Sequence, residues 1–147
     1  MQPIRKILVA VDFSAHSDHA LQTAIDLAKT FGATLDVIHA FDLPIPLMTP
    51  YEVAVPDSYL NEARNAAAQK LAAAAARVAE AGVGGTSHLR EVPAAPAIAD
   101  TAQELGADLI VMGTRGHTGL KHIVLGSVAE RTLRIAPCSV LTVKGEA

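Results

Sequence analysis

The residues best placed to do chemistry lie in a glycine-containing segment at residues 113–127. The segment fits the pattern G-x2-G-x9-G-[ST] on Gly113, Gly116, Gly126 and Ser127. Glycine lets the backbone approach a ligand closely, so successive N–H groups of such a loop can point into one concavity. A helix that begins at Ser127 adds free N–H groups and the positive end of its dipole, which favour phosphate oxygens. The Ser127 hydroxyl can donate to phosphate or ligate Mg²⁺. The segment therefore predicts a phosphate-binding loop.

A simpler interpretation of the same segment stays open. Gly-Ser before a helix is commonly an ordinary cap, with the serine capping the helix, and loop glycines commonly do no more than turn the chain. The position of the segment, directly after an apolar run typical of a buried strand, favours phosphate binding. No Walker A pattern occurs in the sequence. The glycines at residues 82–85 precede a predicted strand, so they indicate a turn and not a Rossmann fingerprint.

Polar residues within this segment, and one after the first apolar run, are further candidates for ligand binding. Asp12 follows the first apolar run, where a carboxylate can accept hydrogen bonds from a nucleoside or cap the next helix. Arg115, His117, Lys121 and His122 would give the loop local positive charge, which would help to neutralise a triphosphate; the alternative is a solvated loop face.

The remaining histidines and the single cysteine suggest structural roles. We expect His39 to be a hydrogen-bonded core residue, and His16, His19 and His88 to lie at the surface. Cys138 has no evident partner, so we expect a buried, unreactive thiol. No His, Cys, Asp or Glu set has zinc spacing, and neither a nucleophile elbow nor an acid–base carboxylate pair is visible. The sequence predicts no catalytic residues.

The elements that must position these residues follow from hydrophobic periodicity. Short apolar runs alternate with helical patterns, which predicts one α/β domain over residues 1–147, with a five-stranded parallel sheet and helices on both faces. Four prolines at residues 41–57 predict a long surface loop. Such sheets bind ligands outside the carboxyl ends of their strands. The predicted strands are residues 7–11, 35–40, 87–92, 109–112 and Ser139–Val143. The first predicted helix ends at Gly32, and the other three cover residues 58–81, 96–105 and Ser127–Ile135.

Composition narrows the class of protein. Half of the 147 residues are hydrophobic but 3% are aromatic, as expected for aliphatic helices on a sheet buried on both faces. A formal net charge of −3 argues against a general nucleic-acid binder. The single cysteine suits a reducing compartment, and no apolar stretch approaches the roughly 20 residues of a membrane span. We expect a soluble, cytoplasmic protein.

Several segments together resemble the universal stress protein family. They are residues 6–14 (KILVAVDFS), 37–40 (VIHA), 107–113 (ADLIVMG), 125–131 (LGSVAER) and 136–143 (APCSVLTV). The resemblance covers nearly the whole chain except residues 41–57. It implies a Rossmann-like fold of the adenine nucleotide alpha hydrolase kind, and a homodimer joined through the last strand, Ser139–Val143. Because the glycine pattern is intact, it also implies the ATP-binding branch of the family.

The resemblance also implies roles for particular residues, with ATP and Mg²⁺ as the ligands. The adenine and ribose would be held by Asp12 and the main chain around Ala10, Val11 and Ala40, and Met112 and Gly113 would line the ribose side. The phosphates would contact Gly116, Gly126, Ser127 and Val128, with Arg115 nearby.

Three functions follow as hypotheses. The first is a dimeric ATP-binding module that acts in stress by conformation or by recruiting protein partners that the sequence does not name. The second is a slow ATP hydrolase or nucleotidyl transferase, which the absence of a visible general base weakens. The third is a nucleotide-independent interaction protein with a vestigial glycine pattern, which the intact glycines and Ser127 argue against.

Overall fold

The computed structural model describes residues 2–42, 56–115 and 125–145. Five strands and four helices alternate along these residues, in the predicted order. The predicted single-domain α/β fold is therefore confirmed. The strands are β1 (Lys6–Ala10), β2 (Thr34–Ala40), β3 (Ser87–Arg90), β4 (Leu109–Gly113) and β5 (Ser139–Val143), and the helices are α1 (Ala15–Phe31), α2 (Asp57–Glu80), α3 (Ala94–Leu105) and α4 (Ser127–Ile135).

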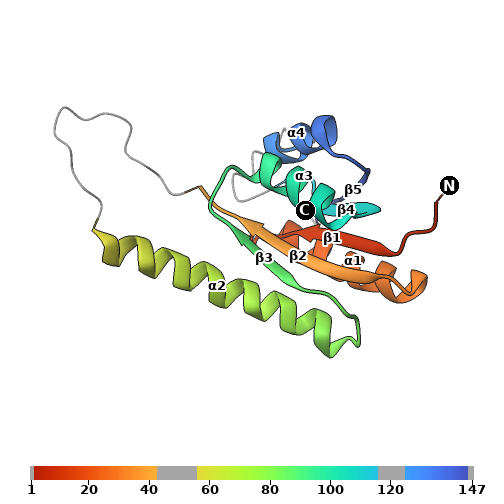
Figure 1. Cartoon of the computed structure of the whole chain (residues 1–147), viewed down its shortest axis with the longest axis horizontal. Coiled ribbons are helices and arrows are strands. Elements are labelled where there is room, and N and C mark those ends of the chain that lie inside the picture. The colour runs from red at the N-terminus through yellow and green to blue at the C-terminus, as the bar shows by residue number, and fades with distance from the viewer. Residues whose placement is uncertain (1, 43–55, 116–124, 146–147) are drawn as a thin grey trace.

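The strands form one parallel sheet in the order β3-β2-β1-β4-β5 (Figure 1). β1 is central, and its Val9 lies in register with Val37 of β2 on one side and Val111 of β4 on the other. The chain places β2 and β3 on one side of β1, and then β4 and β5 on the other. The strand order reverses between β1 and β4, and the carboxyl ends of these two strands form the edge where such sheets bind ligands.

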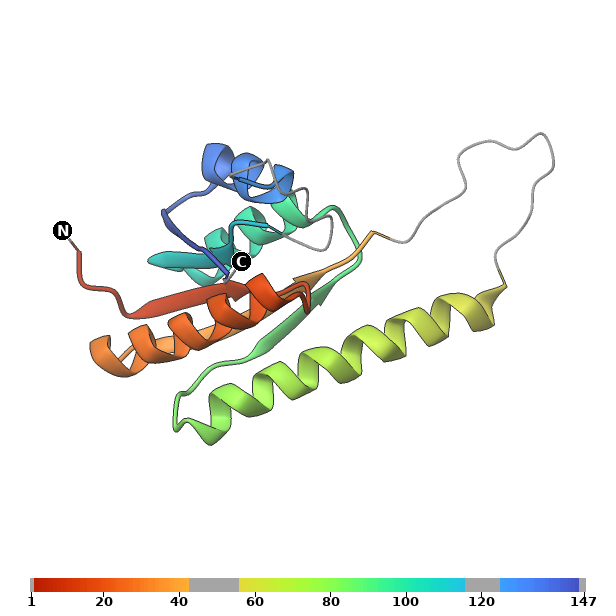
Figure 2. The same cartoon turned by 180° about the vertical axis from the view of Figure 1, so that it is seen from behind.

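Helices cover both faces of the sheet, as Figures 1 and 2 show from opposite sides. α1 and α2 pack on one face, where Ile7 and Leu21 belong to a single apolar cluster. α3 and α4 pack on the other face, where Leu8 and Ile98 belong to a second cluster. Neighbouring residues of β1 thus point to opposite faces, and both clusters are dominated by aliphatic side chains, as the composition predicts.

The helix ends follow local chemistry. The Ser14 hydroxyl caps α1 by accepting a hydrogen bond from the Ser17 N–H. α1 and α3 end at Gly32 and Gly106, which both have a φ of 65°. This left-handed conformation favours glycine, and both ends lie where the sequence predicts them.

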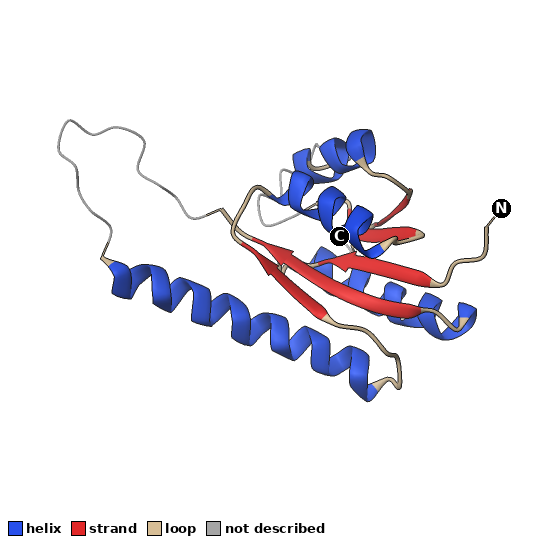
Figure 3. Ribbon diagram, in the orientation of Figure 1, coloured by secondary structure: helices blue, strands red, loops and turns tan. Residues whose placement is uncertain are grey.

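α2 is packed along part of its length. Its buried residues, Leu71, Ala74 and Val78, lie in the second half of the helix. The first half extends past the ends of the strands, and Tyr59 is 56% exposed there (Figure 3). Residues 43–55, which make up most of the predicted proline-rich loop, lie outside the described residues. In the part of the chain that the structure describes, no helix is long and apolar enough to cross a membrane.

Candidate functional site

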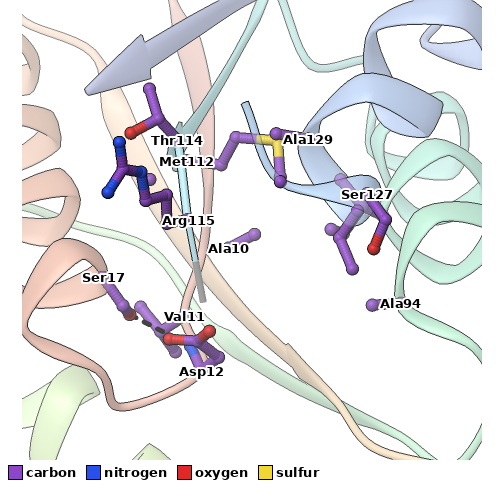
Figure 4. A pocket seen from close by; sticks show the side chains of 14 residues that line it. Ala10, Val11, Asp12, Ser17, Ala94, Met112, Thr114, Arg115, Ser127 and Ala129 are labelled. Carbon is purple, nitrogen blue, oxygen red and sulfur yellow. Dashed lines mark hydrogen bonds between the residues drawn. The ribbon is translucent and has the colours of Figure 1, made fainter. Parts of the chain in front are cut away.

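A cavity of about 260 Å³ opens at the carboxyl edge of β1 and β4, between these strands and the first turns of α3 and α4 (Figure 4). Most of the predicted site residues line it. They are Ala10, Val11, Asp12, Met112, Gly113, Arg115, Gly126, Ser127 and Val128. Residues separated by more than 100 positions in the sequence therefore meet at the predicted edge of the sheet. Figure 4 shows Asp12 and Ser17 on one side of the cavity, and Ser127 and Ala94 on the other.

The turn between β1 and α1 forms the first wall, and its own side chains hold it in place. The Asp12 N–H donates to the Ser17 hydroxyl over 3.0 Å. The Asp12 carboxylate in turn accepts hydrogen bonds from the N–H and the hydroxyl of Ser14. Ser14 and not Asp12 therefore caps α1; Asp12 holds the capping serine and also borders the cavity, and its contact with a nucleoside stays a prediction.

The first turn of α4 forms the opposite wall. The residue that caps this helix is Gly126 and not Ser127, so the expectation of a serine cap is wrong. Ser127 is the first helical residue, and no side chain in the described part of the chain caps α4. First-turn N–H groups of a helix have no partners within the helix itself. The end of α4 is therefore suited to a ligand that accepts hydrogen bonds.

Gly126 has a packing role that the sequence does not reveal. Its φ of −70° and ψ of 161° are open to any residue, so backbone freedom does not explain the glycine. Its N–H donates to the carbonyl of Thr114. A Cβ added to Gly126 would lie 3.1 Å from this oxygen and 3.5 Å from the Cα of Arg115. The absence of a side chain lets α4 begin directly against the backbone that follows β4.

The interior of the cavity is largely apolar. Several of its lining residues were not predicted from the sequence, namely Ser17, Ala94, Ile98, Thr114 and Ala129. Ala94 and Ile98 belong to the first turns of α3 and carry no polar group that would mark them in the sequence. The serine spacing after Asp12 is a signal that could have found Ser17, because Ser14 caps α1 and Ser17 lies in its first turn.

Two predicted site residues are not among those that line the cavity. Ala40 ends β2 and packs, partly buried, against the apolar cluster beneath α3 and α4. Gly116 lies outside the described residues, as do His117, Lys121 and His122. Arg115, which is half-buried, is the cation of the predicted positive group that the structure places at the cavity.

The other histidines divide between confirmed and corrected expectations. His39 is buried and hydrogen-bonded, as predicted. His19 is exposed, as predicted, but His16 is half-buried and its Nδ1 accepts a hydrogen bond from the Gly145 N–H. His88 was expected at the surface, but its side chain is 17% exposed and its Nε2 lies 2.8 Å from the buried carboxylate of Asp36. A buried carboxylate needs such a partner, and the pairing joins two neighbouring strands.

The surroundings of Cys138 lower the reactivity of its thiol. Cys138 is half-buried, where full burial was expected. Partial burial raises the pKa of its thiol, and the nearby negative charge of Asp108 raises it further. A thiol with a raised pKa is a poor nucleophile at neutral pH. Among the described residues, no group of three His, Cys, Asp or Glu side chains lies close enough to hold a metal ion.

The fold and the cavity define an α/β domain of the class that places its ligand site at the carboxyl edge of a parallel sheet. The family model of the universal stress proteins matches residues 3–144. The chain belongs to the universal stress protein family.

Comparisons with individual proteins agree with this assignment. A universal stress protein of Methanocaldococcus jannaschii is 38% identical over 144 residues, covering 95% of this chain and 82% of that protein. The solved structure of the hypothetical protein MJ0577 superposes with a TM-score of 0.84 at 26% identity, with 99% of each chain covered. A universal stress protein from Archaeoglobus fulgidus, solved in complex with dAMP, superposes with a TM-score of 0.67 at 25% identity, covering 97% of this chain and 100% of that one.

Proposed function

We propose that this chain is a dimeric, cytoplasmic ATP-binding module that acts in the stress response by conformation or by recruiting protein partners. The observation that carries this proposal is that one cavity combines an apolar interior with the N-terminus of a helix. Apolar residues line the interior, whereas Gly126, Ser127 and the backbone at Thr114 lie where α4 begins. An apolar wall suits a base, and a helix N-terminus suits phosphate.

The residues present fit a nucleoside triphosphate in one orientation. Asp12, with Ala10 and Val11, would hold the adenine and ribose, and Met112 and Gly113 would line the ribose side. Ala40, which the sequence also predicted there, is not among the residues that line the cavity. The phosphates would lie against Gly116, Gly126, Ser127 and Val128, close to Arg115. A Mg²⁺ ion bound with ATP would neutralise phosphate charge, and the Ser127 hydroxyl is the side chain that we assign to it.

A neighbour supports a nucleotide as the ligand class. The universal stress protein from Archaeoglobus fulgidus was solved with dAMP, which has an adenine base and one phosphate. For this chain we propose ATP instead, because residues 113–127 match the full glycine pattern and because α4 begins at the cavity without a side-chain cap. A longer phosphate chain would use more of these N–H donors than a monophosphate does.

The identity of the ligand is tested by analysing the small molecules that purify with the protein. The protein is purified without dialysis, denatured, and the released small molecules are separated and analysed by mass spectrometry. We expect ATP in amounts close to one per chain, accompanied by Mg²⁺. Release of a ligand without a nucleotide base, from protein that then fails to bind added ATP, would contradict the proposal.

We further propose that two copies of the chain associate through β5. This strand lies at one edge of the sheet, where its outer backbone groups would be open to pairing with another strand. Leu141 of β5 is a large hydrophobic residue that is 37% exposed. A symmetric pairing of β5 with its own copy would cover the strand edge.

The dimer is tested by analytical ultracentrifugation at micromolar concentration. We expect a dimer for the wild-type protein and a monomer for Leu141→Lys, because a lysine in the interface would be buried without a partner. The control is Phe31→Lys, which places the same charge on an exposed hydrophobic residue at the far end of α1 and should leave the dimer intact. A monomeric wild-type protein would contradict this proposal.

A further inference from the structure

The buried residue His39 contacts the wall of the cavity from behind. It lies in β2, and its Nδ1 is 2.8 Å from the carbonyl oxygen of Val11. A carbonyl oxygen can accept but not donate, so Nδ1 must carry a hydrogen and donate it. The Val11 N–H meanwhile donates to the carbonyl of Ile38 over 2.9 Å. Both polar backbone groups of Val11 are thus bound to β2, beyond the last residue of β1.

His39 also supports the unusual backbone conformation of Phe13, which lies two residues after Val11. Phe13 has a φ of 66°, which is uncommon for a residue other than glycine and persists where the surroundings hold it. The Phe13 ring lies against the His39 ring, with 4.4 Å between their centroids. His39 also stacks on Phe41, with 5.8 Å between the ring centroids, and the Lys70 ammonium lies 5.6 Å from the centre of the Phe13 ring. These contacts hold the Phe13 ring beneath α2.

Asp12 lies between these two fixed residues. The Val11 carbonyl is held by the imidazole N–H, and the Phe13 ring is held by the imidazole face, so the peptide groups on both sides of Asp12 have little freedom. Hydrogen bonds to Ser17 and Ser14 complete the restraint. Asp12 lines the cavity as a result, while His39 itself does not.

We propose that His39 is a positioning residue for the nucleoside end of the site. Its Nδ1–H orients the Val11 peptide and thereby directs Asp12 into the cavity. This inference rests on the proposed nucleotide function. It assigns His39 no contact with the ligand, so its effect should appear in the binding of every adenine nucleotide and should not depend on the number of phosphates.

Three variants separate positioning from packing. His39→Phe keeps a ring between Phe13 and Phe41 but removes the N–H donor. His39→Asn removes the ring but keeps a donor, because the amide nitrogen stands at the same number of bonds from Cα as Nδ1. The control is His88→Leu, a half-buried histidine on β3 that partners Asp36 and is not among the cavity-lining residues. Affinities for AMP and for ATP with Mg²⁺ are measured by calorimetry, and urea midpoints are measured on the same preparations.

We expect His39→Phe to weaken AMP and ATP by the same factor, roughly tenfold, which is the order expected for one lost hydrogen bond. His39→Asn should recover most of that loss, although it packs less well. His88→Leu should lower the urea midpoint and leave both affinities unchanged. Should His39→Phe bind both nucleotides as the wild type does, or His39→Asn lose as much affinity, the positioning role would be wrong.

A second measurement tests the inference without a nucleotide. In ligand-free protein, the backbone amide resonance of Asp12, whose peptide group contains the Val11 carbonyl, should shift in His39→Phe and should shift less in His39→Asn. An unmoved resonance in His39→Phe would overturn the role of His39 while leaving nucleotide binding intact. A wild-type protein that binds neither AMP nor ATP would instead defeat the proposed function and this inference together.

Discussion

The two walls of the cavity are built in different ways. On the β1–α1 side, side chains hold the backbone: Asp12, Ser14 and Ser17 form a connected set of hydrogen bonds, and His39 bonds the carbonyl of the neighbouring Val11. On the β4–α4 side, the described contact is between backbones, from the Gly126 N–H to the Thr114 carbonyl. One wall is therefore ordered by the protein itself, whereas the other presents a helix N-terminus to whatever binds there.

This difference suggests that the two walls of the proposed site bind different parts of the ligand. A wall held by its own side chains can present a fixed shape to a rigid group such as a nucleoside. A wall made of helix N–H groups can adapt to a chain of phosphates, with which it makes charge-assisted hydrogen bonds. Variants on the β1–α1 wall should therefore weaken nucleoside binding and protein stability. Variants on the β4–α4 wall should instead reduce the discrimination between ATP and AMP.

The largest effect should follow from Gly126→Val. The new side chain would meet the backbone of Thr114 and Arg115 and would displace the start of α4 from the cavity. ATP binding should be lost, while AMP binding should fall less, and the urea midpoint should fall modestly, because the new Cβ crowds the Thr114 carbonyl although the backbone angles of Gly126 suit any residue. Calorimetry and urea unfolding on the same preparation measure both quantities.

A matched glycine sharpens this prediction. Gly32 ends α1 with a φ of 65°, and a Cβ there would meet nothing within 4 Å. Gly32→Ala should therefore cost about 1 kcal/mol of stability through backbone strain and leave ATP binding unchanged. If Gly126→Val binds ATP normally but unfolds at a lower urea concentration, the glycine serves the turn, and our assignment of the phosphate wall is wrong.

An intermediate effect should follow from Ser17→Ala on the opposite wall. The buried Ser17 hydroxyl accepts the Asp12 N–H, so the variant removes the partner of a partly buried donor. We expect a loss of about 1–2 kcal/mol of stability, with similar weakening of AMP and ATP. A thermal or urea titration gives the stability, and calorimetry gives the two affinities. Weakening confined to ATP would contradict the assignment of this wall to the nucleoside.

The smallest effect should follow from Arg115→Ala. Arg115 is half-buried and lines the cavity, and its charge would act on phosphate through partly screened electrostatics. ATP affinity should fall severalfold in low salt and by less in high salt, with little change for AMP. A salt titration of both affinities measures this. Equal loss for ATP and AMP at every salt concentration would place Arg115 outside the phosphate region.

The fold was largely predictable because its signals are local. Apolar runs and helix-ending glycines such as Gly32 and Gly106 act on their own neighbours, and the limits of α4 and β5 were correct to the residue. β3 was the weakest prediction and ends at Arg90, two residues earlier than expected. It is a short edge strand, and its apolar pattern is interrupted by His88, which contacts Asp36.

The cavity was predictable where the lining residues follow strands, and less so elsewhere. Asp12 and Gly113 were found because parallel strands bring their carboxyl ends to one edge. Ala94 and Ile98 carry no chemical signal, and their place depends on how α3 packs. The role of Gly126 was open because a glycine that permits a turn and one that permits close packing look alike in a sequence.

The most direct test of the proposed site is a comparison of ATP and AMP affinities in the presence of Mg²⁺, measured by calorimetry on nucleotide-free wild-type protein. Since both ligands share the adenosine that we assign to the β1–α1 wall, the difference reports the β4–α4 wall alone. We expect ATP to bind at least about tenfold more tightly, the equivalent of one or two additional hydrogen bonds to charged oxygens. Equal affinities for AMP and ATP would contradict a phosphate-binding loop at residues 113–127.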